Sequence, residues 1–288
     1  MDTLYKYSTK IESFFYQPTL KFSVPGFIND PFESSIARSI TEYLDIKTAD
    51  ALEFDMNNEL MNVGIVSFSE TSRNLLMWAH YADQHHGMCI GFSCDVLSEL
   101  NTENERFLQY HTLLPVKVNY DNLRVDLKEL KSKDHSVYEE GLKRTLTTRS
   151  DEWIYEKEHR CIVPIGWSDR AFLIEENKKV KQALDTYHPQ NYKFNIDTGE
   201  ITSTMKSIVF EDLCYYKGML FLKDILPKSV KSIHLGYRFG RDEALKLAEN
   251  LKKPSHPLHH IELFQYKLSK TRFELEEFEI YPNNTLHI

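Results

Sequence analysis

The chain lacks most of the local patterns that identify a protein class at first reading. Its 288 residues include only four cysteines and no CxxC pair, which disfavours a disulfide framework or zinc knuckle and favours buried, reduced thiols. The ten glycines show neither GxGxxG nor Walker spacing, so any nucleotide would have to bind on another scaffold. The absence of a GxSxG motif disfavours a serine hydrolase built on a nucleophile elbow.

The sequence also lacks a long apolar run, a leader pattern and an excess of basic residues. No apolar stretch approaches the roughly 18 residues that a membrane span requires, and the N-terminus shows no charged-then-apolar signal. Lysine and arginine number 35 against 43 acidic residues, a formal net charge of -8, which argues against a broad basic surface for nucleic acid and leaves a local basic groove open. We therefore expect a cytoplasmic protein with no membrane partner.

Twelve histidines raise the question of a metal site. His80 and His85 are five residues apart, which places them on diverging faces of a helix, whereas a zinc helix presents two histidines four residues apart. His259 and His260 fall in a loop-like stretch where solvated histidines are ordinary. We expect no metal cofactor.

The remaining composition predicts one folded α+β domain. The chain is 41% hydrophobic and 12% aromatic, enough for a sizeable core, and no repeat or linker divides residues 1–288. Its pattern favours mainly antiparallel sheets with flanking helices, and a polar, weakly periodic stretch at about 169–217 is expected to form a peripheral insertion. Strands are expected near 4–8, 64–70, 88–93, 115–121, 153–163 and 230–240, with a strand pair in 259–281, and helices near 31–44, 45–62, 71–87, 123–149 and 241–253.

The stretch WIYEKEHRCIV, residues 153–163, sets two carboxylates and an arginine into what otherwise reads as an apolar strand. Alternation along a strand would put Glu156, Glu158 and Arg160 on one side. Two neighbouring carboxylates raise each other's pKa unless a cation or a ligand lies between them. A structural ion pair between Arg160 and Glu158 is one interpretation, and a functional cleft is the other.

Further polar residues stand on elements that otherwise resemble core. Each has an ordinary explanation alone, as a strand-edge lysine, a turn former, a cap or an amphipathic wall. Together with the two glutamates they form a candidate site, and they are Lys6, Asn29, Asp30, Ser67, Ser69, His80 and Tyr81.

These residues lie in segments that carry a resemblance. LYKY, NDPFE, VSFSE, LMWAHYADQHHGMCIGF, WIYEKEHR and IHLGYRFG resemble the successive signatures of a bacterial family of cytosolic proteins with a domain of unknown function. That family brings no established activity. The order of the motifs also resembles the ADP-ribosyltransferase fold, in which a basic first-strand residue, a mid-chain serine or tyrosine and a late Glu-x-Glu surround NAD.

The second resemblance implies roles around NAD, which would be the substrate. Glu158 would stabilise the positive charge that develops on the ribose when the bond to nicotinamide breaks, and Glu156 would orient the acceptor. Lys6 would contact the ribose or the diphosphate. The first strand of such enzymes usually carries histidine or arginine at this place, so Lys6 is a departure.

The same resemblance implies roles for the serine strand and the aromatic helix. Ser67 or Ser69 would orient the carboxylate, and Tyr81 or Trp78 would stack on nicotinamide. The serine motif reads Ser-Phe-Ser without a threonine, which is a second departure.

The resulting expectation is an NAD-dependent ADP-ribosyltransferase-like enzyme acting as a toxin or anti-phage defence effector. Its acceptor would be an unknown protein or nucleic acid, and an antitoxin or other regulatory partner would restrain it. Two alternatives stay open. One is NAD hydrolysis without transfer, and the other is a non-catalytic module in which Asn29, Asp30, His80 and Glu158 form a polar network that pins the core or recognises a nucleotide or partner.

Overall fold

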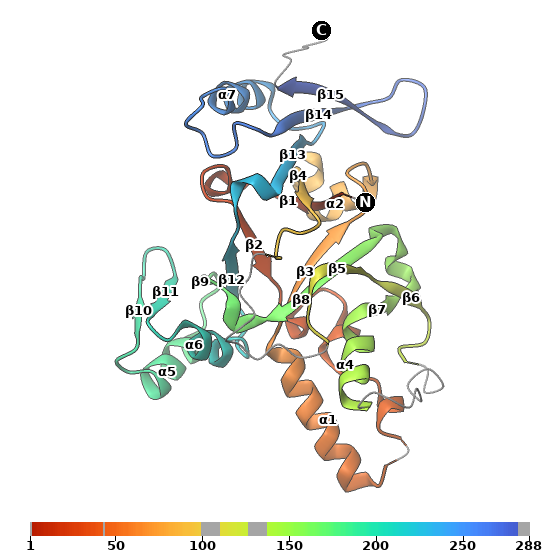
Figure 1. Ribbon diagram of the computed structural model, residues 1–288, viewed down its shortest axis with the longest axis vertical. Helices are drawn as coiled ribbons and strands as arrows, with labels where there is room; N and C mark the ends of the chain where they lie inside the picture. The colour runs from red at the N-terminus through yellow and green to blue at the C-terminus, as the bar shows by residue number, and fades with distance from the viewer. Residues whose placement is uncertain (1, 43, 99–109, 126–136, 282–288) are drawn as a thin grey trace.

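The computed structural model describes residues 2–42, 44–98, 110–125 and 137–281, and they form an α+β structure with two large sheets (Figure 1). The eight-stranded sheet has the order β15 (Leu275–Tyr281), β14 (Glu262–Leu268), β13 (Val230–Leu235), β4 (Met88–Ser93), β1 (Thr3–Ser8), β3 (Val63–Ser69), β8 (Glu158–Pro164), β5 (Thr112–Lys117). The five-stranded sheet has the order β10 (Tyr192–Phe194), β11 (Glu200–Ser203), β9 (Arg170–Leu173), β12 (Met219–Asp224), β2 (Thr19–Phe22). A small sheet pairs β6 (Asn119–Asp121) with β7 (Thr148–Ser150).

Most strand pairs are antiparallel, as the sequence predicts. Among the described residues β13 with β14 and β6 with β7 are the parallel pairs. The α-helices are α1 (Ile46–Met61), α2 (Leu75–Tyr81), α4 (Val137–Thr147), α5 (Lys178–Tyr187), α6 (Lys206–Leu213) and α7 (Arg241–Leu251). The 3-10 helices are η1 (Glu12–Phe15), η2 (Pro25–Phe27), η3 (Pro31–Ser34), η4 (Arg38–Ile40), η5 (Asp83–His85), η6 (Asp151–Glu156), η7 (Ile165–Trp167) and η8 (Pro227–Ser229).

The two large sheets share a hydrophobic core and touch at one backbone bridge. Phe22 and Phe221 of the smaller sheet belong to the same buried cluster as Phe68 and Phe92 of the larger one. Beyond β2, Ser23 pairs with Ile65 of β3 through hydrogen bonds of 2.9 and 2.8 Å. Near this bridge, Lys6, Ser67 and Ser69 of the larger sheet line a common cavity with residues of the smaller sheet.

Two further clusters support this framework. Helices α1 and α4 pack against β3 and β8 through residues such as Met56, Leu142 and Ile162. Helix α2 packs against β1 and β14, with Trp78 at the centre of that cluster. The four cysteines form no disulfide in the described structure; Cys94 is half-buried and the other three are buried.

The predicted helix at residues 31–44 is wrong. Pro31 and the Asp30 side chain, which accepts from Phe32 N, begin only the short helix η3. The backbone oxygens of Phe32 and Ser35 then accept from the Arg124 guanidinium, so they are taken by a tertiary contact. For that reason the helix does not continue from η3 into η4.

The other boundary errors also have local causes. Helix α2 starts after its cap Asn74 and ends at Tyr81, because Asp83, Gln84 and His85 all adopt positive φ. The predicted strand 115–121 is divided between β5 and β6. Of the predicted helix 123–149, residues 137–147 are helical, 148–150 form β7, and 126–136 lie outside the described residues.

The polar stretch 169–217 contributes β9, α5, β10, β11 and α6 (lower left in Figure 1). Ala171, Leu184 and Val209 from this stretch are buried in the core shared by the two sheets. Its status as a separate insertion stays a prediction.

Candidate active site

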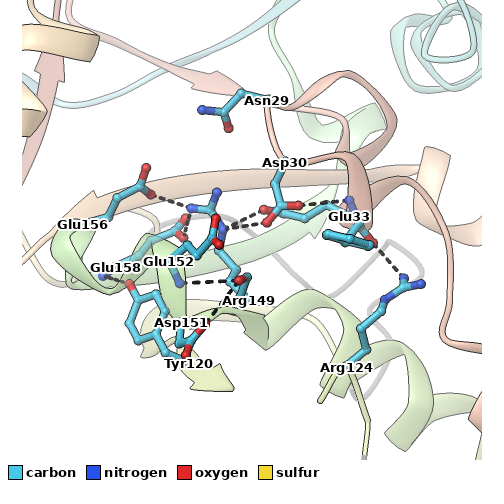
Figure 2. Close-up of polar contacts among 12 residues, drawn as sticks. Asn29, Asp30, Glu33, Tyr120, Arg124, Arg149, Asp151, Glu152, Glu156 and Glu158 are labelled. Carbon is cyan, nitrogen blue, oxygen red and sulfur yellow. Dashed lines mark hydrogen bonds and ion pairs between the residues drawn. The ribbon is translucent and has the colours of Figure 1, made fainter. Parts of the chain in front are cut away.

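A buried ion network joins segments that are far apart in the sequence. Arg149 lies at its centre, with Glu156 and Glu158 on one side and Asp30 and Glu33 on the other (Figure 2). Arg149 Nη1 lies 2.9 Å from Glu158 Oε2, and Arg149 Nε lies 2.9 Å from Glu33 Oε1 and 3.5 Å from Asp30 Oδ2. The short contact of Arg149 Nη1 with Glu156 Oε2 completes the set.

Arg160 is the second cation of the network. Its Nε and Nη2 bind the two oxygens of Glu158 at 2.8 and 3.0 Å, and Nη2 also donates to Glu33 Oε1 at 2.8 Å. Arg160 is 1% exposed and Glu158 2%, so the pair is fully desolvated. The ion pair between Arg160 and Glu158 that the sequence suggested is confirmed, within a larger network.

A turn, and not a continuous strand, brings the two glutamates together. Residues 151–156 form the 3-10 helix η6, Lys157 adopts the left-handed conformation (φ 47°), and β8 begins only at Glu158. The predicted strand over 153–163 is therefore wrong in its first half. Ser69 Oγ donates to the Glu156 carbonyl at 2.7 Å and Glu158 N donates to Tyr120 Oη at 2.7 Å, which fixes the backbone on both sides of the turn.

The charges of the network do not cancel. Four carboxylates, Asp30, Glu33, Glu156 and Glu158, surround two guanidiniums, so the fully ionised group carries a surplus negative charge. Burial opposes the ionisation of Glu158, but Arg160 and Arg149 outweigh it and lower its pKa to about 2. Burial raises the pKa of Glu156, with Glu158 adding to this effect and Arg149 opposing it. The pKa values of the two glutamates are thus shifted in opposite directions.

The network opens onto a cavity of about 860 Å³ lined from both large sheets. Glu156, Glu158, Arg149 and Arg160 form part of its wall. Lys21 of β2 and Arg170 of β9 line it from the smaller sheet, where Arg170 is paired with Asp224 at 2.7 Å. Apolar side chains complete the wall, among them Phe27, Ile28, Phe68, Ile90, Phe92, Phe172 and Leu222. A cavity of this size, apolar with a few convergent charged groups, is typical of a small-molecule site.

Lys6 is our candidate for a cationic ligand contact in the cavity wall. Its Nζ donates to the Ser67 carbonyl at 2.9 Å and lies 5.9 Å from the centre of the Phe68 ring. Burial and the positive charge of Lys21 lower the pKa of Lys6 to about 8. Lys6 therefore stays mostly protonated at neutral pH but holds its proton weakly.

Tyr81 connects the helix α2 to the network. Its hydroxyl donates to Glu156 Oε1 at 2.6 Å and accepts from Asn29 Nδ2 at 2.8 Å. Burial and the carboxylate of Glu156 raise the pKa of Tyr81. Tyr81 remains a neutral hydrogen-bond donor at the cavity wall.

The structure brings most of the residues singled out from the sequence to one cavity. Its wall contains Lys6, Asn29, Ser67, Ser69, Tyr81, Glu156 and Glu158. Asp30 lies behind the wall, in the ion network. Two residues are placed elsewhere. Trp78 is fully buried in the core with its indole N–H bonded to the Ser72 carbonyl, so it cannot stack on a ligand, and His80 is exposed against Tyr81 and Tyr155, outside the cavity lining.

Around Glu158, three residues escaped sequence reasoning: Arg149, Glu33 and Tyr120. Glu33 stands in the NDPFE signature, so that motif offered a signal for it. Arg149 follows the end of α4 and Tyr120 lies on β6, and only the pairing of β6 with β7 places them beside Glu158. No local pattern marks either of them.

The described part of the chain shows no group of three or more histidine, cysteine or acidic residues placed to hold a metal ion. None of its helices has the length and apolar character needed to cross a membrane.

Residues 77–161 match the model of a family described as a protein of unknown function, DUF2971. The matched segment covers less than half of the chain and includes Tyr81, Arg149, Glu156 and Glu158, whereas NDPFE and IHLGYRFG lie outside it. The match agrees with the resemblance to a family of unknown function. No curated protein and no solved structure matches the chain.

Proposed function

We propose that the cavity between the two sheets binds NAD and that the protein is an ADP-ribosyltransferase-like enzyme. One observation carries the proposal: an ionised carboxylate, Glu158, is held by Arg149 and Arg160 at the wall of a cavity that also presents Lys6. The volume of about 860 Å³ is in the range of small-molecule and cofactor sites.

The charge distribution suits this ligand. Lys6 and Lys21 offer positive charge to the diphosphate, and the apolar wall around Phe68 and Phe172 offers surface for the rings. The surplus negative charge around Glu158 favours the cationic nicotinamide and the oxocarbenium-like ribose of the transition state. Fixed charges of this kind stabilise a transition state without reorganisation.

The proposed reaction needs only the residues at the wall. The bond between nicotinamide and the ribose C1 breaks, and nicotinamide leaves with the electron pair. An acceptor oxygen or nitrogen then bonds to C1 and gives its proton to Glu156. The raised pKa of Glu156 favours this task, because a carboxylate with a raised pKa is the better proton acceptor.

The setting of the activity follows the resemblance of the sequence. We propose a cytoplasmic toxin or anti-phage effector, with a protein or nucleic acid as acceptor and an antitoxin or regulatory partner. Water as the acceptor would make the same site an NAD glycohydrolase.

A non-catalytic nucleotide-binding role is the second candidate. The observation that favours it is the occupation of both Glu158 oxygens by Arg149 and Arg160. A carboxylate so engaged could serve only to hold the wall of a binding cavity.

Incubation with NAD labelled in the adenylate separates the candidates. The protein is mixed with labelled NAD alone, with added protein and with added nucleic acid. Label on a macromolecule supports transfer, and free nicotinamide with soluble ADP-ribose supports hydrolysis. Intact NAD in all three mixtures, together with saturable binding, would leave only the non-catalytic role.

A further inference from the structure

A second cavity, of about 480 Å³, lies beside strands β1, β13, β14 and β15 of the eight-stranded sheet. Its wall is almost entirely polar and comes from β1, β13, β14, β15 and the segment 70–73. Tyr5 lines both cavities, whereas the ion network around Arg149 contributes nothing to the second one. The second cavity is therefore chemically separate from the proposed NAD site.

A serine, a histidine and a glutamate stand in series in this wall. Ser232 Oγ lies 3.0 Å from His234 Nε2, and His234 Nδ1 lies 3.4 Å from Glu277 Oε2. His234 Nε2 is thus within hydrogen-bond distance of a hydroxyl, whereas Nδ1 lies near a carboxylate without a hydrogen bond to it. Ser232 and His234 are buried, while Glu277 is half-exposed.

The backbone is adapted to seat Ser232. A β-bulge between Val230 and Ser232 shifts the register of β13 against β4. Gly91 on β4 faces the serine, and a Cβ at this position would lie 2.5 Å from Ser232 Oγ. β-Bulges often re-aim a side chain beside an active site. Here the bulge and the glycine together leave room for the hydroxyl.

The surroundings hold the histidine ring and the carboxylate. The ring of Phe264 stacks on His234 with centroids 4.9 Å apart and an interplanar angle of 14°. Tyr266 Oη donates to Glu277 Oε2 at 3.3 Å and lies 2.7 Å from Ser72 Oγ. His234 Nδ1 is buried without a hydrogen-bond partner, and Glu277 Oε2, 3.4 Å away, is a carboxylate oxygen within ion-pair distance of it.

We propose that Ser232, His234 and Glu277 form a second active site that transfers or hydrolyses short acyl esters of polar alcohols. Ser232 is the nucleophile, His234 is the general base, and Glu277 is the positioning residue that keeps the Nδ1 proton in place. The GxSxG pattern is absent, but such a series is recognised by geometry on unrelated folds and not by sequence order. The proposal does not depend on NAD binding.

The reaction is balanced by these groups and water. Ser232 Oγ bonds to the acyl carbon while its proton moves to His234 Nε2, and the ester bond breaks as the alcohol leaves with that proton. Water then attacks the acyl-serine with His234 as base, and the acid and free Ser232 are restored. Arg73 and Lys231, which line the same cavity, supply positive charge for the oxyanion.

A small fluorophosphonate probe tests the proposal in the full-length protein. The probe phosphonylates an activated serine, and peptide mapping by mass spectrometry locates the adduct. We expect one adduct on Ser232, lost in S232A, and a labelling rate about 100-fold lower in H234Q, since a general base typically contributes 10²- to 10⁴-fold.

Glu277 is half-exposed, so we expect its variants to fold even if H234Q does not. They therefore provide an independent test of the same site. E277Q should slow labelling of Ser232, and E277D should restore part of the rate at the same melting temperature. S93A, on the adjacent strand β4, should be labelled like the unaltered protein. Absence of an adduct on Ser232, or equal labelling rates in E277Q, E277D and the unaltered protein, would overturn the proposal.

Discussion

Glu158 is tied both to the ion network and to the proposed NAD cavity. From the sequence alone, a catalytic glutamate and an arginine-paired glutamate are alternatives that the stability of E158Q would separate. In the structure the same carboxylate pairs with Arg149 and Arg160 and lines the cavity. Loss of stability in E158Q is therefore expected under both roles, and it cannot decide between them.

E158Q should reduce the free energy of unfolding in a pH-dependent way. Breaking a buried pair costs about 3 to 5 kcal/mol, and the low end is expected because Glu33 still binds both arginines. The folded pKa of Glu158, about 2, lies below its ordinary value of 4.5, so its contribution is present above pH 4.5 and is lost toward pH 2. Urea unfolding from pH 3 to 7 should show the two proteins converging in acid. A difference that does not change with pH would contradict the assignment.

Lys6 should show a linkage of the same sign, but at alkaline pH. Its folded pKa of about 8 lies below the ordinary 10.5, so between these values the unfolded chain binds more protons and stability rises with pH. K6M should lack this rise when both proteins are unfolded by urea from pH 7 to 10.5. The same titration should weaken NAD binding by the unaltered protein above about pH 8. Parallel stability curves for the two proteins would refute the predicted burial of the ammonium.

At the scale of elements, the turn at Lys157 brings Glu156 and Glu158 together. Strict strand alternation predicts that Glu156 and Glu158 share a face, and the structure reaches the same convergence through η6 and one left-handed residue. A lysine gives no local signal for this conformation, which usually favours glycine or asparagine. The pairing of the two glutamates was thus predicted, but by the wrong geometry.

Substitutions at Lys157 test this turn. A left-handed residue other than glycine costs about 1 to 2 kcal/mol, so K157G should be as stable as the unaltered protein or up to about 1 kcal/mol more stable. K157V should lose stability, because a β-branched side chain tolerates this conformation worst. Urea unfolding measures both. Equal effects of glycine and valine would show that residue 157 is not left-handed in solution.

Elements with strong periodicity or β-branched content were predictable, including α1, β3, β4, α7 and the pair β14 and β15. The errors lie where side chains from distant segments replace local hydrogen bonds. Arg124 takes the carbonyls of Phe32 and Ser35, so no helix continues from Pro31. Such contacts depend on the tertiary structure and leave no trace in the local sequence.

At the scale of the whole molecule, the sequence predicted which residues lie close together but not the strand order that places them there. Lys6, Ser69 and Glu158 meet because β1, β3 and β8 are neighbours in one sheet. The opposite wall, with Lys21 and Arg170, comes from a second sheet that the weak pattern of residues 169–217 did not reveal. Strand order across large sequence separations carries no local signal.

A ligand that contacts both sheets should stabilise the whole structure. Binding to the folded state alone raises the free energy of unfolding by about 2.7 kcal/mol at 100 times the dissociation constant. NAD should therefore raise the melting temperature, and nicotinamide alone should raise it less because it lacks the diphosphate that Lys6 and Lys21 would contact. An unchanged melting temperature at millimolar NAD would contradict the proposed ligand.

The most direct measurement is nicotinamide release from NAD by E158Q and by E33Q. Glu33 is as buried as Glu158 and binds the same two arginines, but it does not line the cavity. Both variants lose one charge from the same network, which makes E33Q the matched control. We predict that E158Q loses release at least 100-fold, as removal of a transition-state charge typically does, while E33Q retains most of it. Equal rates in the two variants, or no release by the unaltered protein, would contradict a catalytic Glu158.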